Sequence, residues 1–149
     1  MKQGKALHIL LADDDEDDTF LFTEALEHIP IEIKLDIAEN GIKLMHKLKN
    51  DNSIPDLIFL DMNMPVKNGL ECLTEIRNSD LFREVPVIVL STSVAGHLLE
   101  SAYKEGANLY IQKPTSFYSL VEVLKKCLLR KEDLKNPSSL EHFLIPNNN

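Results

Sequence analysis

The most constraining feature of the sequence is the apolar run Leu57–Leu60, which ends abruptly in Asp61 and leads into a loop containing Pro65. A short apolar run bounded by turn-forming residues is typical of a strand buried on both faces, as at the centre of a parallel sheet. Asp61 would then lie at the carboxyl end of the strand, the edge where open α/β sheets bind ligands. It is a candidate functional carboxylate, although a helix N-cap or a turn could also explain an Asp there.

Four further strands are expected around this one, at residues 8–12, 33–38, 87–90 and 109–112. Between and after them, apolar residues recur at helical spacing. The last of these helices is expected to turn five side chains toward the core: Phe117, Leu120, Val121, Leu124 and Leu128. Five strands alternating with five helices predict right-handed βαβ crossovers, and therefore an α/β fold with a doubly wound parallel sheet.

Composition and charge narrow the class of function. The 149 residues suit one domain. With 24 acidic and 16 basic residues the net charge is -8, which argues against direct nucleic-acid binding. The apolar runs fall short of the roughly 20 residues that cross a bilayer, and the start of the chain is too short in apolar residues for a secretory signal. Cys72 and Cys127 lack metal-ligand spacing, which predicts reduced thiols in a cytoplasmic protein.

We expect one domain over residues 1–130 and a C-terminal tail over residues 131–149. Because no further domain follows, the domain is expected to stand alone. The tail breaks the strand and helix pattern at Pro137 and ends in asparagines, yet it carries four apolar residues: Leu140, Phe143, Leu144 and Ile145. A tail that docks these side chains and a disordered tail are both open at this point.

Polar side chains follow four of the five predicted strands: Asp13 and Asp14, then Asp61, Ser91 and Lys113. Three carboxylates converging in one cleft would raise one another's pKa values unless a cation held them. Oxygen donors with room for water suit Mg²⁺, which also bridges phosphate groups. Lys113 could pair with an anion, and the Ser91 hydroxyl could bond a phosphoryl oxygen. Together these side chains predict a phosphoryl site with an Asp nucleophile.

This arrangement resembles the receiver domain of two-component response regulators over about residues 6 to 130. The resemblance is carried by the Asp pair, the hydroxyl, the aromatic, the Lys-Pro pair and the motif Asp-Met-Asn-Met-Pro-x-x-x-Gly over residues 61–69. It implies a flavodoxin-like (βα)5 fold with sheet order 2-1-3-4-5. The acidic run and residues 91–93 look like those of stand-alone receivers paired with phytochrome-type histidine kinases.

The resemblance also implies roles. Asp61 would be phosphorylated by a histidine kinase or a phosphotransfer protein. Asp14 would bind Mg²⁺ directly, Asp13 through water and Asn63 through its backbone carbonyl. The chain would act as a phosphoacceptor that takes part in its own phosphorylation and dephosphorylation, rather than as an enzyme.

Ser91 and Tyr110 would form a switch pair, in which Tyr110 turns inward from an outward rotamer once phosphate attracts the hydroxyl. Ser91 stands where Thr is commoner in the family, which keeps the donor and loses a methyl group. Lys113 would contact the phosphate, and its bond to Pro114 would be cis. The output would be changed contacts with a downstream protein that the sequence does not name. A homodimer is left open, and neither nucleic acid nor membrane is expected as a partner.

Two other motifs compete for the acidic run. Asp13, Asp15, Asp17 and Glu24 fall at positions 1, 3, 5 and 12 of an EF-hand loop, but position 6 is Asp18, where glycine is needed, and a strand precedes the run.

The segment Asp15–Thr19 resembles the DxDxT motif of haloacid-dehalogenase-like phosphatases, in which Asp15 would be the nucleophile. Asp13 and Asp14 separate that motif from its strand, however. A degenerate receiver that only binds partners is a third alternative, and the intact Asp, hydroxyl and Lys set argues against it.

Overall fold

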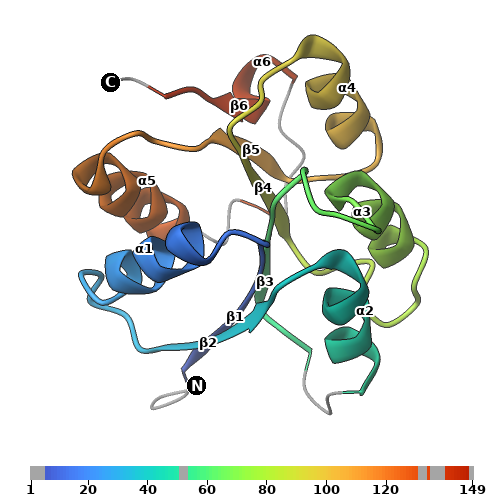
Figure 1. The fold of residues 1–149 in the computed structure, drawn as a ribbon, viewed down its shortest axis with the longest axis horizontal. Helices are drawn as coiled ribbons and strands as arrows, with labels where there is room; N and C mark the ends of the chain where they lie inside the picture. The colour runs from blue at the N-terminus through green and yellow to red at the C-terminus, as the bar shows by residue number, and fades with distance from the viewer. Residues whose placement is uncertain (1–5, 51–53, 131–133, 135–139, 148–149) are drawn as a thin grey trace.

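The computed structural model describes residues 6–50, 54–130, 134 and 140–147, which form a parallel sheet in the order β2-β1-β3-β4-β5-β6 (Figure 1). The strands are β1 (Leu7–Ala12), β2 (Ile33–Ala38), β3 (Leu57–Leu60), β4 (Val87–Ser91), β5 (Leu109–Gln112) and β6 (Leu144–Ile145). The helices are α1 (Glu16–Leu26), α2 (Gly41–Asn50), α3 (Gly69–Arg77), α4 (Gly96–Lys104), α5 (Phe117–Leu129) and α6 (Leu140–Phe143). The order 2-1-3-4-5 of the first five strands confirms the predicted doubly wound, flavodoxin-like fold.

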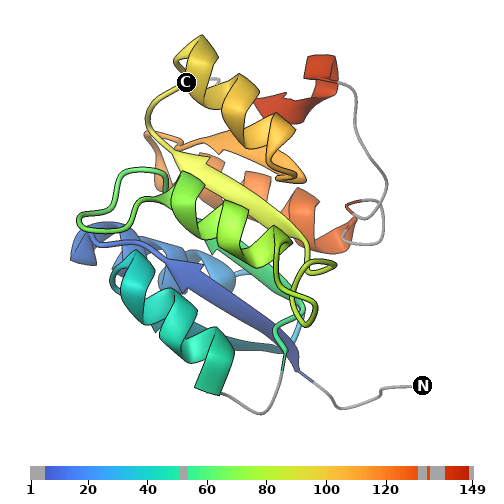
Figure 2. The ribbon, with the colours of Figure 1, turned by 90° about the vertical axis from the view of Figure 1, so that its right-hand side faces the viewer.

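Helices cover both faces of the sheet: α1 and α5 lie on one face, and α2, α3 and α4 on the other (Figures 1 and 2). Because successive strand residues point to opposite faces, β3 feeds two cores. Ile58 and Leu60 pack on the side of α2, α3 and α4, while Leu57 and Phe59 pack on the side of α1 and α5. All four side chains are at most 1% exposed, which explains why the run is apolar without alternation. None of the described helices is long and apolar enough to span a membrane.

Helix α5 differs from the prediction at its first residue. Leu124 and Leu128 are buried as expected, but Phe117 is 37% exposed. Phe117 follows the N-cap Ser116 directly, and its ring meets the ring of His28 edge-on, with the centroids 5.5 Å apart. The ring therefore packs against the segment after α1 instead of entering the core.

The C-terminal segment adds an element that sequence patterns did not predict. Strand β6 pairs in parallel with β5, so that Leu144 lies opposite Tyr110 and Ile145 opposite Ile111. Phe143 is 1% exposed and meets the rings of Tyr103 and Tyr110 edge-on. Apolar side chains of this segment are thus docked on the sheet, whereas residues 131–133, 135–139 and 148–149 of the predicted tail lie outside the described part of the chain.

A clamp of polar contacts joins the segments that precede β4 and β5. The Arg77 guanidinium at the end of α3 donates to the carbonyl oxygens of Gly106 (2.9 Å), Arg83 (3.1 Å) and Val85 (2.8 Å), and to Asn108 Oδ1 (2.9 Å). The same Asn108 oxygen accepts the backbone N–H that opens β4, at 2.8 Å. Burial lowers the pKa of Arg77, but the guanidinium keeps its charge because its ordinary pKa is so high.

We expect Arg77→Met to lower the free energy of unfolding by about 3 kcal/mol, because several partly buried acceptors lose their donor at once. Arg77→Lys keeps the charge but cannot reproduce the planar fork, so it should recover only part of the loss. Urea unfolding followed by circular dichroism measures both values. A loss below about 1 kcal/mol for Arg77→Met would show that the clamp contributes little beyond a surface contact.

Candidate functional site

The predicted site residues meet at the carboxyl edge of the sheet because parallel strands end there together. Two backbone hydrogen bonds extend the ladders past the strand ends: Asp61 N–H donates to Ala12 O (3.0 Å), and Lys113 N–H donates to Ser91 O (2.8 Å). These bonds fix the backbone from which the functional side chains project. The structure brings together all five residues that the strand ends were expected to supply: Asp13, Asp14, Asp61, Ser91 and Lys113.

Three carboxylates form the centre of the site. One oxygen from each of Asp13, Asp14 and Asp61 lies within 4.8 Å of the others, with Asp13 and Asp61 buried and Asp14 exposed. Backbone N–H groups orient the two buried ones: Asp15 donates to Asp13 Oδ1 at 2.9 Å, and Asn63 donates to Asp61 Oδ1 at 3.3 Å. Asn63 thus lies beside the cluster, and its predicted role as a carbonyl ligand stays a prediction.

Burial works against the charge on these groups. The pKa of Asp61 is raised to about 6: desolvation is the largest cause and the charges of Asp13 and Asp14 add to it, while the Lys113 ammonium and the backbone hydrogen bond from Asn63 lower it. Desolvation likewise raises the pKa of Asp13, against the backbone hydrogen bond from Asp15 and the charge of Lys113. One lysine therefore compensates the cluster only in part.

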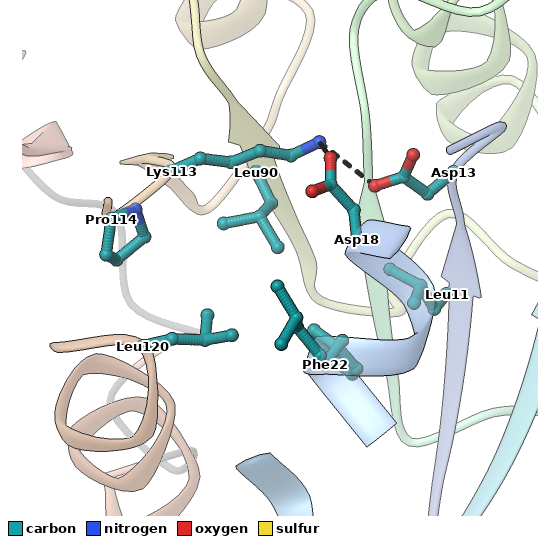
Figure 3. Close-up of a pocket in the computed structure, with 9 residues that line it drawn as sticks. Leu11, Asp13, Asp18, Phe22, Leu90, Lys113, Pro114 and Leu120 are labelled. Carbon is teal, nitrogen blue, oxygen red and sulfur yellow. Dashed lines mark hydrogen bonds and ion pairs between the residues drawn. The ribbon is translucent and has the colours of Figure 1, made fainter. Parts of the chain in front are cut away.

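Lys113 is the predicted cation of the site, and its nearest partner, Asp18, is not among the predicted site residues. Its Nζ lies 2.7 Å from Asp18 Oδ2 and 3.0 Å from Asp13 Oδ2 (Figure 3). The third carboxylate, Asp61, is farther away, with Oδ2 at 3.8 Å. Burial alone would lower the pKa of Lys113; the hydrogen bond to Asp18 and the charges of Asp61 and Asp13 hold it above its usual range instead. The spacing of Asp18, in the first turn after the Asp pair, was the only available signal.

Both residues of the predicted switch are buried, but Tyr110 does not take the expected rotamer. The Ser91 side chain is fully buried, and its Oγ accepts the N–H of Ser93 at 3.3 Å. The expected outward rotamer of Tyr110 is wrong, because the ring is fully buried and its hydroxyl donates to Ser93 O at 2.6 Å. This inward position satisfies the hydroxyl and packs the ring against Phe143, a contact made by the C-terminal segment.

A family model described as "Response regulator receiver domain" matches residues 9–125. The chain belongs to this family. Among its relatives, response regulator Rcp1 of Synechocystis is 31% identical over 122 residues, covering 78% of this chain and 83% of Rcp1. The chemotaxis protein CheY of Halobacterium salinarum is 34% identical over 124 residues, covering 83% of this chain and 98% of CheY.

Solved structures agree with this assignment. Phosphorylated RcpA, a cyanobacterial phytochrome response regulator, superposes with a TM-score of 0.79 at 29% identity, covering 91% of this receiver and 98% of RcpA. The Mn²⁺-bound form of Rcp1 gives a TM-score of 0.76 at 29% identity, covering 88% and 96% of the two chains.

The donor set of this receiver fits a divalent cation. The cluster offers hard carboxylate oxygens, and the exposure of Asp14 leaves one side open to water, which suits the octahedral shell of Mg²⁺. The excess of buried negative charge over the single ammonium is the physical reason for a cation to bind here.

The structure bears on three expectations from the sequence: the cis bond before Pro114, the EF-hand alternative and the phosphatase alternative. The described residues contain no cis peptide bond, so the predicted cis bond before Pro114 is wrong, and the chain keeps the trans isomer that X–Pro bonds favour when nothing selects cis. The EF-hand alternative is wrong because β1, a strand, precedes the acidic run. The Asp15 carboxylate caps α1 by accepting the N–H of Asp18, which is a structural role, and Asp13 rather than Asp15 follows the strand, in contrast to the phosphatase alternative.

The loop between β3 and α3 explains the spacing of the Pro-x-x-x-Gly motif. A Cβ at Gly69 would lie 2.3 Å from the carbonyl oxygen of Asp61, so only glycine lets α3 start so close to the site. Val66 adopts φ 67°, an unfavourable conformation for a β-branched residue, in a turn closed by Lys67 N–H donating to Pro65 O at 2.7 Å. The loop that follows Asp61 therefore contains a strained residue at Val66.

The raised pKa of Asp61 predicts a pH dependence for the metal-free receiver. Between about pH 4 and pH 6 the native state binds a proton at Asp61 that the unfolded chain has lost, so stability falls as the pH rises through this window. Asp61→Asn removes the titrating carboxyl group and with it this pH-dependent contribution to the free energy of unfolding. Its free energy of unfolding, relative to wild type in EDTA, should rise by about 2–3 kcal/mol from pH 4 to pH 7.

Chemical denaturation at several pH values measures this difference, with Asp56→Asn as a control at an exposed carboxylate outside the cluster. A difference between Asp61→Asn and wild type that stays constant from pH 4 to pH 7 would contradict the raised pKa.

Proposed function

We propose that this receiver accepts a phosphoryl group on Asp61 from a histidine kinase or phosphotransfer protein and signals through changed protein contacts. The observation that carries the proposal is the buried Asp61 carboxylate, which shares its site with two other carboxylates and lies 3.8 Å from the Lys113 ammonium. A carboxylate so placed combines a nucleophile with positive charge at the position of a bound phosphoryl group.

In the proposed step, an Asp61 carboxylate oxygen attacks the phosphorus of a phosphohistidine. The new O–P bond forms while the N–P bond breaks, and the imidazole leaves with the bonding electron pair. Hydrolysis would return Asp61 to its free carboxylate. Water attacks the phosphorus, the bond between the phosphorus and the Asp61 oxygen breaks, and inorganic phosphate is released. The receiver would thus act as a phosphoacceptor in its own phosphorylation and dephosphorylation, without turning over a separate substrate.

The side chains around Asp61 would divide the remaining tasks. Asp13, Asp14, Asp61 and the backbone carbonyl of Asn63 would hold Mg²⁺, which when bound supplies positive charge to the phosphoryl oxygens. Lys113 would contact the phosphoryl group from the other side of the cleft. Ser91, whose hydroxyl is buried at the end of β4, would donate to a phosphoryl oxygen.

Ser91 and Tyr110 would transmit the change. Because Tyr110 is already inward and bonded to Ser93 O, the proposed switch acts on that hydrogen bond and on the neighbouring segment, rather than on an outward ring. A ligand shifts such an equilibrium only by its differential affinity for the two states. One or two charge-assisted hydrogen bonds to the phosphoryl group supply about 1.5–3 kcal/mol each.

The proposal extends to partners and place. The likeness to Rcp1 and RcpA supports a phytochrome-type histidine kinase as the class of phosphodonor. We place the exchange in the cytoplasm, where the free cysteines Cys72 and Cys127 would stay reduced. Residues 1–130 would form the receiver, and residues 131–149 a tail that is ordered at least where Phe143 docks. Phosphorylation would change the contacts of the receiver with a downstream protein, with a second copy of itself, or with both.

Asp61→Asn should abolish phosphorylation by acetyl phosphate with Mg²⁺, because the amide keeps the shape of the carboxylate but is no nucleophile. The matched control is Asp15→Asn, a change at an exposed helix cap that should leave labelling close to wild type. Separation of phosphorylated from unphosphorylated chains on a phosphate-affinity gel measures both. Label retained by Asp61→Asn, or lost by Asp15→Asn alone, would refute the assignment and favour the phosphatase-like alternative.

A further inference from the structure

The Lys113 ammonium is shared unequally among three carboxylates. Its distances are 2.7 Å to Asp18, 3.0 Å to Asp13 and 3.8 Å to Asp61, so hydrogen bonds reach only the first two. Figure 3 shows the lysine side chain extending toward Asp13, which follows β1, and toward Asp18 in the first turn of α1. The residue proposed to contact a phosphoryl group on Asp61 is therefore held away from Asp61 by its neighbours.

Asp18 is a fixed anchor for this contact. Its backbone N–H donates to the Asp15 side chain at 3.0 Å, which holds it in the first turn of α1. A carboxylate in the first turn is also favoured by the helix dipole. Beneath the ion pair lies a small cavity of about 60 Å³, lined in part by Leu21, Phe22 and Leu120, so the lysine stem has apolar surroundings. With 14% of its side chain exposed, Lys113 has few alternatives to these carboxylates.

We propose that Asp18 is a positioning residue that holds the Lys113 ammonium toward α1 and so limits its contact with Asp61 and with a phosphoryl group bound there. The proposal rests on the proposed function of Asp61. Asp13 would keep Lys113 in the cleft without Asp18, because their hydrogen bond is 3.0 Å long and Asp13 is buried. Loss of Asp18 therefore redistributes the ammonium within the site rather than removing it.

This redistribution affects a cation and an anionic phosphoryl mimic in opposite directions. An ammonium released from Asp18 moves closer to Asp13 and Asp61, where it competes with Mg²⁺ for the same oxygens. The same movement brings it closer to a phosphoryl mimic on Asp61, whose negative charge it stabilises. A variant with a merely damaged site would instead bind both ligands less well.

The test compares wild type with Asp18→Asn in two titrations. Calorimetry with MgCl₂ alone should show Mg²⁺ bound about two- to fivefold more weakly by Asp18→Asn, the size expected for an ion pair with one partly exposed member. Beryllofluoride at saturating Mg²⁺, followed by ¹⁹F NMR, should bind about two- to fivefold more tightly. Asp18→Ser, which also lacks the carboxylate, should reproduce both signs.

The control is Asp17→Asn, which removes the same formal charge from the same helical turn. Asp17 is exposed and makes no ion pair with Lys113 in the described part of the chain, so screening should keep both changes below about twofold. Equal changes in Mg²⁺ and beryllofluoride binding by Asp17→Asn and Asp18→Asn would overturn the proposal. They would show that the net charge of this helical turn, and not the contact with Lys113, determines the binding. Weaker binding of both ligands by Asp18→Asn, or no change in either, would overturn it as well.

Failure of the proposed function has a different signature. If Asp61 were not the phosphoacceptor, wild type would give no bound beryllofluoride signal, or Asp61→Asn would keep the signal that wild type gives. If only the role of Asp18 were wrong, wild type would bind beryllofluoride and Asp18→Asn would match it.

Discussion

The burial of negative charge at the end of β3 is the constraint on which the site depends. Asp13 and Asp61 are both buried and lie close to the third carboxylate, Asp14, yet among the described residues only the Lys113 ammonium pairs with them. Removing a carboxylate from water is costly unless it is paired or hydrogen-bonded. Two backbone N–H groups and the shared lysine offset part of this desolvation cost. The raised pKa of Asp61 shows that the negative charge is only partly compensated. Such a site favours binding of an additional cation.

The contacts that stabilise the fold despite these buried charges lie elsewhere in the sheet. All four side chains of β3 are buried, and the Arg77 clamp joins the segments before β4 and β5. The amino ends of these strands are thus held by apolar packing and satisfied polar contacts, while their carboxyl ends hold crowded charges and a strained turn at Val66. Local rules are broken mainly where function is proposed, as expected for a natural sequence.

The five strands and the cluster could be predicted because they depend on simple regularities, whereas the sheet order 2-1-3-4-5 was implied by the resemblance to receiver domains. Short apolar runs identify the strands, and parallel topology then brings Asp13, Asp61, Ser91 and Lys113 to one edge regardless of loop detail. Asp18 could not be recognised in this way. It lies inside a run of acidic residues at a helix start, where carboxylates are common for reasons of capping and dipole alone.

Other features depend on tertiary contacts that leave no pattern in the sequence. Strand β6 has only two residues, too few for an alternating signal, and it forms because β5 offers a free edge. The inward position of Tyr110 in turn depends on Phe143. Arg77 would be assigned to a solvated helix face on charge alone, although its guanidinium reaches four acceptors.

We propose that Asp61, among the several acidic residues of this edge, is the one that becomes phosphorylated. Borohydride reduces an aspartyl phosphate to homoserine, so treatment of the phosphorylated protein followed by peptide mass spectrometry identifies the residue directly. We expect homoserine at position 61, dependent on Mg²⁺ and on the phosphodonor. Homoserine at position 13, 14 or 15, with position 61 unmodified, would contradict it.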